Sequence, residues 1–347
     1  MIQKLTIHGF RCFRELSVEP LKRVNLFVGQ NNAGKTSLLE AVELVAIGGV
    51  EGLVRSAVRR DEDVLRRFES GEEYKEHVVD PSHLFFGHEL KVGKSFSIEA
   101  DRERRWVKCT VEHASEDMET LILTLCFESH VTASQGKNQR LTISPSGGVL
   151  PPPGYLAEPK PRVNFLDPRL SGTGQLGKLW EALVLTPEED EVVEALKIIE
   201  PRIERLAVLG ETRGGPAKIL LKLDGIEQRI PLGTLGGGIR SLLALVLNLF
   251  SARGGFLLVD EIDTGLHYSV MVDMWRLVVE TATRLDIQVF ATTHSLDCVD
   301  ALARLRNKYP KIAEEITLHR VEKDASQTVV YDVDELVIAA ESEIEVR

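Results

Sequence analysis

Residues 24–36 read VNLFVGQNNAGKT, an apolar run that leads into a glycine-rich loop. The run Val24 to Val28 predicts a buried strand, and residues 29–36 match the pattern GxxxxGK(S/T). From residue 35 to residue 47 apolar side chains recur at helical spacing, so we expect a helix directly after the loop. A strand, a glycine loop and a helix in this order predict a phosphate-binding loop. The alternative is a glycine-rich turn with a chance lysine, but it does not explain the strand before the loop or the helix after it.

The chemistry of this loop suits a nucleoside triphosphate. Its glycines let backbone N–H groups at the start of a helix point at a phosphate. Lys35 would neutralise the β- and γ-phosphates, and the hydroxyl of Thr36 would ligate Mg²⁺. We therefore expect ATP and Mg²⁺ as cofactors. The loop residues expected to contact them are Gly29, Asn31, Asn32, Ala33, Gly34, Lys35, Thr36 and Ser37.

Two acidic residues, Asp260 and Glu261, follow the apolar run of residues 256–259. A buried strand would deliver Asp260 to the Mg²⁺ at its C-terminal edge, and Glu261 would act as general base on the attacking water. Alone this is a weak signal, but beside a phosphate loop it predicts an ATPase. About 225 residues separate the loop from the acids. Small GTPases and simple kinases place them much closer, whereas a split core with a large insertion is the layout of ABC-type heads.

A glycine cluster lies one expected helix before the acidic pair. Residues 235–241, LGGGIRS, resemble the LSGGQ signature of ABC-type proteins, with Gly236 in the serine position and Ile239 in the glutamine position. In those proteins the loop binds the γ-phosphate of the nucleotide held by the partner subunit, which implies such contacts for Gly237 and Gly238. Backbone N–H groups at a helix start still bind an anion without the serine hydroxyl. A plain glycine hinge is the alternative.

Two further residues complete the expected site. His294 follows the apolar strand predicted at residues 287–291, at the edge where ligands bind in open α/β sheets. There its imidazole would touch the γ-phosphate or the catalytic water, although a lone histidine is usually structural. Asp263, in the segment 262–267, occupies the place of the D-loop that meets the other subunit in ABC-type proteins. The expected catalytic residues are Glu261, His294 and Lys35, and the expected metal ligands are Thr36 and Asp260.

These motifs together resemble one group of ATPases. Residues 7–13, IHGFRCF, are similar to the GF+xF opening of SMC, RecF and OLD-type ATPases. Residues 259–267, VDEIDTGLH, and 288–295, QVFATTHS, are similar to the OLD-like branch (overcoming lysogenisation defect) of the ABC-type, RecF- and SMC-related AAA ATPases. In that family Arg11 would lie near the bound nucleotide. A surface arginine at a strand edge is the alternative.

Pattern and resemblance also predict the organisation of the chain. Apolar strands that alternate with helices predict an α/β ABC-type P-loop ATPase head with a mainly parallel core sheet. Residues 94–145 predict an antiparallel β region, residues 176–209 a short helical insertion, and Asp224-Gly225 a β-hairpin. The expected divisions are an N-terminal ATPase lobe, the helical insertion and a C-terminal ATPase lobe, at residues 1–165, 166–212 and 213–347.

Composition narrows the function further. Of the 347 residues, 43% are hydrophobic and 27% are charged, as in an ordinary soluble protein. A net charge of −11 opposes bulk attraction to DNA or an anionic membrane but leaves room for a local basic groove. The four cysteines form no CxxC pair, so no zinc site is expected. The N-terminus lacks the apolar core of a signal peptide, and no stretch has the roughly 18 apolar residues of a membrane span, so we expect a cytoplasmic protein.

Three functions are consistent with these features. The first is an ATP-driven homodimer or higher homo-oligomer that senses foreign nucleic acid, in defence against phages, and controls a separate effector protein such as a nuclease. It is favoured because only about 50 residues follow His294, too few for the TOPRIM nuclease domain that full OLD proteins carry there. The second is a RecF-like DNA-repair ATPase that clamps DNA directly. The third, a transporter subunit with a membrane partner, is disfavoured by the degenerate signature.

Direct DNA binding requires a basic groove. Two groups of arginines offer one, although a solvated surface is the more common role of such groups. The arginines are Arg55, Arg59 and Arg60 in the first group and Arg102, Arg104 and Arg105 in the second.

Overall fold

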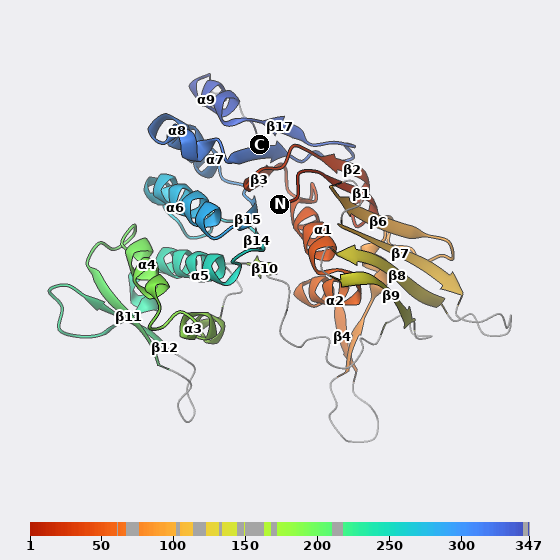
Figure 1. Ribbon diagram of the computed structural model, residues 1–347, viewed down its shortest axis with the longest axis horizontal. Helices are drawn as coiled ribbons and strands as arrows, with labels where there is room; N and C mark the ends of the chain where they lie inside the picture. Colours follow the sequence, from red (N-terminus) through yellow and green to blue (C-terminus); the bar gives the residue numbers. More distant parts are fainter. Residues whose placement is uncertain are drawn as a thin grey trace.

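The computed structural model describes most of the chain (Figure 1). The described residues are 1–60, 62–66, 76–101, 105–113, 123–131, 134–143, 149, 163–167, 172–209, 218–342 and 346. Arg102 and Arg104, two candidates for a basic groove, lie outside them. No helix among the described residues is long and apolar enough to cross a bilayer.

A mainly parallel sheet forms the centre of the described structure. Its order is β10-β14-β15-β3-β16-β17, in which β17 alone runs antiparallel to its neighbour. The strands are β3 (Val24–Val28), β10 (Val163–Leu166), β14 (Phe256–Val259), β15 (Gln288–Thr292), β16 (Ile316–Arg320) and β17 (Val329–Tyr331). All residues of β3, β14 and β15 are buried, as their nearly unbroken apolar sequences require. The expected α/β fold with a mainly parallel core is therefore confirmed.

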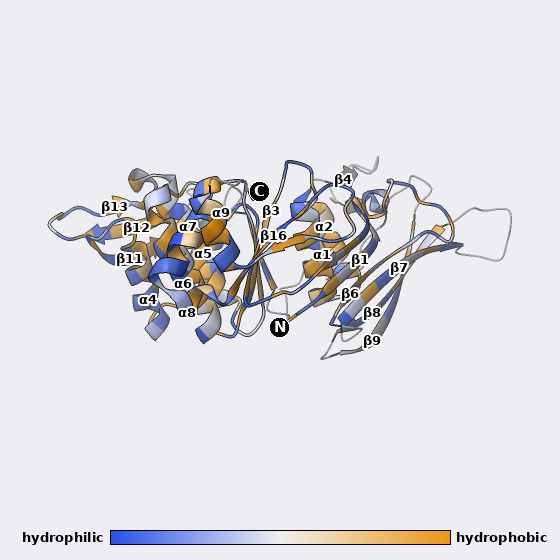
Figure 2. Ribbon diagram, turned by 90° about the horizontal axis from the view of Figure 1, so that it is seen from above, coloured by the Kyte–Doolittle hydropathy of each residue, from blue (hydrophilic) through white to orange (hydrophobic). Residues whose placement is uncertain are grey.

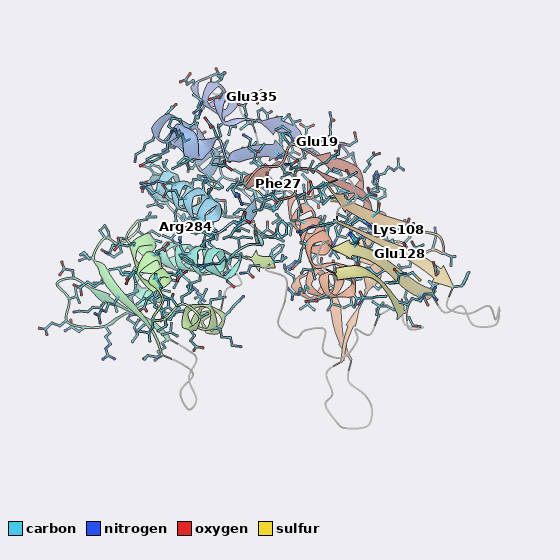
Figure 3. All side chains as sticks on the ribbon, in the orientation of Figure 1. Glu19, Phe27, Lys108, Glu128, Arg284 and Glu335 are labelled. Atoms are coloured by element: carbon cyan, nitrogen blue, oxygen red, sulfur yellow. The ribbon has the colours of Figure 1, made fainter. Side chains whose placement is uncertain are left out.

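An antiparallel sheet of order β2-β1-β6-β7-β8-β9 lies beside this core, and helix α1 (Lys35–Ile47) packs between the two sheets (Figure 1). The strands are β1 (Leu5–Phe10), β2 (Phe13–Val18), β6 (Ser95–Ala100), β7 (Arg105–His113), β8 (Leu123–Val131) and β9 (Ser134–Thr142). One face is buried and the other is exposed, where Lys108 of β7 lies opposite Glu128 of β8 in the strand register (Figure 3). The antiparallel region expected over residues 94–145 is thus present, and β1 and β2 extend it.

Neighbouring residues of the core strands face opposite sides of the sheet. Phe27 and Phe290 pack in the core that contains α1, and their rings stack with centroids 6.3 Å apart. Leu26 and Val289 pack in the second core, which helices of the C-terminal part of the chain cover (Figure 2). These helices are α5 (Gly237–Ser251), α6 (Met271–Arg284), α7 (Leu296–Lys308), α8 (Pro310–Ala313) and α9 (Val333–Glu341).

Two smaller groups of elements connect these layers. After α1 come α2 (Gly49–Arg59), the hairpin of β4 (Asp63–Arg66) and β5 (Glu76–Val79), and the 3₁₀ helix η1 (Pro81–Leu84). Between β10 and α5 lie α3 (Thr173–Glu181), α4 (Pro187–Leu196), β11 (Ile203–Leu209), β12 (Lys218–Leu223), β13 (Ile230–Pro231) and η2 (Leu232–Leu235). The turn expected at Asp224-Gly225 is present, but the strand expected over residues 226–230 shrinks to β13, because β12 and β13 first pair at Leu221 and Ile230 and leave a longer loop between them.

The insertion differs from the sequence expectation in one respect. Residues 203–209, expected to be helical, form β11, because pairing with β12 supplies the backbone hydrogen bonds that a helix would have made internally. The expected boundary at residues 165 and 166 falls within β10, a strand of the core sheet. The expected boundary at residues 212 and 213 falls outside the described residues, between two paired strands.

A buried histidine lies in β16 beside the phosphate-loop strand. His319 has no exposed surface, its ring centroid lies 5.4 Å from that of Phe27, and its Nδ1 lies 3.1 Å from the hydroxyl of Thr328. Burial lowers the pKa of His319 from 6.5 to about 4, because the interior disfavours the charged imidazolium.

This burial predicts a specific acid sensitivity. Between pH 6.5 and about 4 the unfolded chain protonates this histidine and the folded chain does not. The free energy of unfolding should therefore fall by about 3 kcal/mol as the pH drops through that window. We expect His319→Gln to remove this part of the slope in denaturant unfolding curves at a series of pH values. Parallel pH curves for the variant and the wild type would contradict the prediction.

Candidate nucleotide-binding site

A cavity of about 390 Å³ opens where β3, β14 and β15 end. It brings the phosphate loop and the acidic pair together although they are far apart in sequence. Its lining residues are Arg11, Cys12, Asn32, Gly34, Lys35, Thr36, Ser37, Arg60, Glu62, His83, His88, Asp260, Glu261 and His294. A larger cavity of about 610 Å³ lies against residues 29–33 and 320–323. Neither Asp260 nor Glu261 lines the larger cavity, so the smaller one is the candidate site.

Two positions of the phosphate loop require glycine, because neighbouring atoms leave no room for a Cβ. Gly29 and Gly34 have φ values of 142° and 99°, a region that side chains rarely adopt. A Cβ on Gly29 would collide with the carbonyl oxygen of Val321, and one on Gly34 would lie 2.6 Å from the sulfur of Cys12. Among the described residues, no side chain caps the start of α1 and its first turn carries no acid. The first N–H groups of α1 are therefore available to an anion.

Lys35 is held against its own loop. Its Nζ donates to the carbonyl oxygens of Gly29 at 2.7 Å and Gln30 at 2.9 Å, and lies 3.4 Å from Nδ1 of His294. Burial lowers the pKa of Lys35 to about 8, and the nearby charge of Asp260 opposes this shift. A bound triphosphate would supply the negative charge that this ammonium lacks in the protein alone.

The two expected metal ligands are in contact. The hydroxyl of Thr36 donates to Oδ2 of Asp260 at 2.8 Å. Among the described residues there is no group of three or more histidine, cysteine or acidic side chains that could hold a metal. A hydroxyl beside one carboxylate, next to a phosphate loop, fits Mg²⁺, which takes few protein ligands and completes its shell with phosphate oxygens and water. Thr36 and Asp260 would therefore hold Mg²⁺ together with the nucleotide.

Thr292, a residue that the sequence patterns did not single out, positions both acids. Its hydroxyl donates to Oδ1 of Asp260 at 2.5 Å and accepts from the backbone N–H of Glu261 at 2.8 Å. Glu261 has a left-handed φ of 53°, and its Oε2 accepts from the hydroxyl of Thr264 at 3.3 Å. Such a backbone costs about 1 kcal/mol or more for a residue other than glycine. The hydrogen bond to Thr292 helps to hold this conformation.

Thr293 plays a similar part for the expected D-loop residue. Its hydroxyl donates to Oδ1 of Asp263 and accepts from the backbone N–H of Ser295 at 2.9 Å. Both threonines are fully buried. The available sequence signal was two consecutive hydroxyl residues at the end of an apolar strand, immediately before His294.

Arg11 lies in the wall of the cavity but is committed to partners within the protein. Its guanidinium pairs with Glu40 at 2.9 Å and Glu62 at 2.5 Å and donates to the hydroxyl of Ser56 at 2.8 Å. The side chain is 4% exposed, so the alternative of a surface arginine is wrong. Arg60 completes the cluster, with Nε 2.6 Å from Glu40. A direct contact between Arg11 and the nucleotide stays a prediction.

The signature-like loop lies outside this cavity. Gly236 precedes α5, and Gly237 and Gly238 begin it. A Cβ on Gly238 would lie 2.6 Å from the carbonyl oxygen of Gly265, so the loop packs closely on the segment that follows Asp263. A Cβ on Gly237 would meet no atom within 4 Å. The start of α5 is therefore accessible from outside, and this chain alone does not bring it to its own phosphate loop.

The sequence is similar to several known proteins. The family model described as "AAA domain, putative AbiEii toxin, Type IV TA system" matches residues 24–300. An ATP/GTP phosphatase of Helicobacter pylori (strain ATCC 700392 / 26695) is 21% identical over 342 residues, covering 87% of each protein. The DNA replication and repair protein RecF of Stenotrophomonas maltophilia (strain R551-3) is 38% identical over 76 residues, which is 21% of either chain.

Solved structures show the same fold. An SMC head bound to the C-terminal winged-helix domain of ScpA has a TM-score of 0.52 and 14% identity, covering 96% of this chain and 99% of that one. An SMC head with an extended coiled coil, bound to the C-terminal domain of ScpA from Pyrococcus furiosus, has a TM-score of 0.50 and 13% identity, covering 99% of both. The chain therefore has the α/β fold of SMC head domains.

The buried cluster around Glu40 predicts an unequal response to two similar substitutions. Glu40→Ala leaves two arginines without their shared carboxylate and should lower the free energy of unfolding by about 3 kcal/mol. Glu51 pairs with Arg55 at 2.7 Å on the partly exposed side of α2, so Glu51→Ala should cost less than about 1 kcal/mol. Denaturant unfolding measures both values. Equal losses would show that the Glu40 cluster does not stabilise the fold as argued.

Proposed function

The chain belongs to the AAA-domain family whose model matches residues 24–300, and from this we propose that it binds and hydrolyses Mg-ATP as a dimer that closes around the nucleotide. The local similarity to RecF and the SMC-head fold support an ABC-type ATPase. One observation carries the dimer proposal: the phosphate loop and acids share a cavity that the signature-like glycines do not reach. A second copy would supply these glycines.

Binding would begin with the basic groups of the cavity. Lys35 would leave the carbonyl oxygens of Gly29 and Gln30 and move its ammonium to the β- and γ-phosphates. The N–H groups at the start of α1 would bind the same phosphates without rearrangement, because no side chain among the described residues caps them. Mg²⁺, when bound with ATP, would neutralise phosphate charge and fix the geometry of the leaving group.

Hydrolysis would depend on Glu261 as general base. Its carboxylate lines the cavity one residue after Asp260, and Thr292 holds the backbone of both. His294, whose Nδ1 lies 3.4 Å from Nζ of Lys35, is placed to contact the γ-phosphate. The partner's Gly237 and Gly238 would close on that phosphate with backbone N–H groups. Loss of the γ-phosphate after hydrolysis would remove this link and loosen the dimer.

The second part of the proposal concerns the use of this cycle. The ATPase would act as a switch and scaffold in defence against phages or other foreign DNA and control a separate effector, for which a nuclease is one candidate. The OLD-like motifs support this part. The family description also names a putative toxin and a toxin–antitoxin system. The alternative is a RecF-like ATPase that binds DNA directly in repair.

The ion pairs of α2 and of Arg60, which follows it, weigh against direct DNA binding through these arginines. Arg55 pairs with Glu51, and Arg59 donates to both oxygens of Glu43 at 2.7 and 2.8 Å. Arg60 is paired with Glu40. Arginines that are already neutralised by carboxylates offer little attraction to a phosphate backbone. This observation favours the switch and effector over a DNA clamp on this surface.

Substitutions in the cavity should separate binding from turnover. Lys35→Ala should abolish ATP binding, because it removes the cation that the phosphates require. Glu261→Gln should bind ATP but lose at least about a hundredfold in turnover and accumulate as an ATP-dependent dimer. Equilibrium binding, phosphate release and sedimentation measure these effects. Rapid turnover by Glu261→Gln would rule out Glu261 as the general base.

A second substitution tests the contribution of the partner copy. Gly237→Asp introduces a negative charge at the start of α5, in open space where the side chain fits the monomer. Added to Glu261→Gln, it should abolish the ATP-dependent dimer and leave ATP binding to the monomer intact. A dimer that persists at the same ATP concentration would contradict closure through this loop.

The function in the cell can be tested by identifying the molecule that co-purifies with the closed dimer. We expect Glu261→Gln, purified with ATP from its native cells, to carry a stoichiometric protein with a nuclease or other toxic-effector fold. The Gly237→Asp form of the same variant serves as the control and should not retain it. Recovery of DNA fragments with no protein partner would instead support direct DNA clamping.

A further inference from the structure

Two histidines that belong to none of the sequence motifs line the nucleotide cavity. His83 and His88 belong to the segment 80–88, which follows the β4–β5 hairpin. They share the cavity with Lys35 and Asp260, so they face whatever that cavity binds. Their place within the cavity follows from the contacts around them.

The contacts order the cavity from a catalytic end to an opposite end. At the catalytic end, Lys35 approaches His294 and Thr36 contacts Asp260. Ser37 starts the path away from it, because its hydroxyl accepts from Arg60 at 3.0 Å. From Arg60 the path continues through Glu40 to Arg11, which donates to Glu62 and to the carbonyl oxygen of His83 at 3.4 Å. The histidines therefore lie at the end remote from the γ-phosphate position.

A nucleoside triphosphate must place its base at this remote end. The phosphate loop and the acids would hold the β- and γ-phosphates, and the rest of the nucleotide would extend past Ser37, the residue that follows Thr36. The cavity volume of about 390 Å³ includes both ends. The base therefore meets the wall that contains the histidines.

The backbone of this wall is held firmly before any ligand binds. The N–H of Arg11 donates to the carbonyl oxygen of Leu84, and that of Phe86 donates to the carbonyl oxygen of Gly9, both at 2.8 Å. Phe85 is fully buried, with its ring 5.3 Å from that of Phe96. A rigid wall binds a flat ligand without the entropy cost of ordering a loop.

His88 adopts a backbone conformation that is unusual for its residue type. Its φ is 57°, in the left-handed region, and its side chain is exposed. Histidine is one of the residues enriched there, but the conformation is strained and tends to occur at functional sites. Burial of the ring does not offset this backbone strain, since the ring is exposed at the surface of the cavity.

The two imidazoles form a defined pair. Their centroids lie 5.3 Å apart at an interplanar angle of 66°, and their Nδ1 atoms are 3.3 Å apart, so one of the two donates a hydrogen to the other. Asp80 lies 3.7 Å from Nε2 of His83, on the other side of that ring. His83 is thus held between Asp80 and His88, and the side chain of His88 is exposed.

We propose that His88 stacks on the base of the bound nucleotide and that His83 is the positioning residue that fixes the orientation of the His88 ring. The proposal rests on the proposed nucleotide-binding function and adds the ligand class. A ring that contacts the face of a base favours the larger purines over pyrimidines. Such contact reads no base edge, so it distinguishes adenine from guanine only weakly. The site would accept ATP and GTP and disfavour CTP.

The test compares nucleotides on the full-length protein. His88→Asn keeps the left-handed backbone but removes the ring, and it should raise the KM for ATP and GTP by about tenfold with kcat unchanged. His88→Phe should retain most of the affinity for ATP. His83→Asn should give a smaller rise in KM, and the surface variant His113→Asn should give none. The preference of the wild type for ATP over CTP should shrink in His88→Asn.

Inorganic triphosphate provides the control that isolates the base. As a competitive inhibitor it should bind the wild type and His88→Asn equally, since it lacks a nucleoside. An unchanged KM for ATP in His88→Asn, or an equal loss of triphosphate affinity, would overturn the stacking role. Failure of the wild type to bind ATP would instead overturn the proposed function. Melting temperatures show whether each variant is folded. His88→Phe and His88→Asn test the role of the ring independently, since the first keeps an aromatic ring and the second removes it.

Discussion

Glu40 lies on α1 between two sheets with no exposed surface, so its charge has to be neutralised inside the protein. Arg11 and Arg60 provide this neutralisation, and each is anchored in a different element. Arg11 belongs to the turn between β1 and β2, whose backbone also holds the segment that contains His83, and Arg60 follows α2 and reaches Ser37. One buried carboxylate therefore aligns three walls of the cavity around the start of α1.

The parallel sheet supplies the other half of the site. Because β14, β15 and β3 run in the same direction, their C-terminal ends meet at one edge and bring Asp260, His294 and the phosphate loop together. The fully buried hydroxyl of Thr292 then links the two acids that follow β14. A buried hydroxyl with both a donor and an acceptor partner is rigid, because losing either partner would leave a polar group unsatisfied. The geometry of this end of the cavity thus depends on a residue that does not itself line it.

The two ends of the cavity differ in chemistry. The catalytic end consists of charged groups and backbone N–H groups that suit phosphate and Mg²⁺, and the remote end presents imidazole rings on a backbone held by Arg11. The signature-like glycines at the start of α5 are accessible but lie away from both ends. In the proposed dimer, one copy of the chain would bind the nucleotide and a second copy would close on it.

Features that depend on local backbone geometry could be predicted from the sequence. The phosphate loop, the apolar strands before it and before Asp260, and the turn at Asp224-Gly225 each rest on a few consecutive residues with restricted dihedral angles. Other features depend on segments that meet only in the folded chain. The strand at residues 203–209 exists because β12 offers it an edge, and β10 belongs to the core sheet because it pairs with β14. The burial of Arg11, the bridging role of Thr292 and the cavity position of His88 are likewise decided by tertiary contacts, since each needs partners tens or hundreds of residues away.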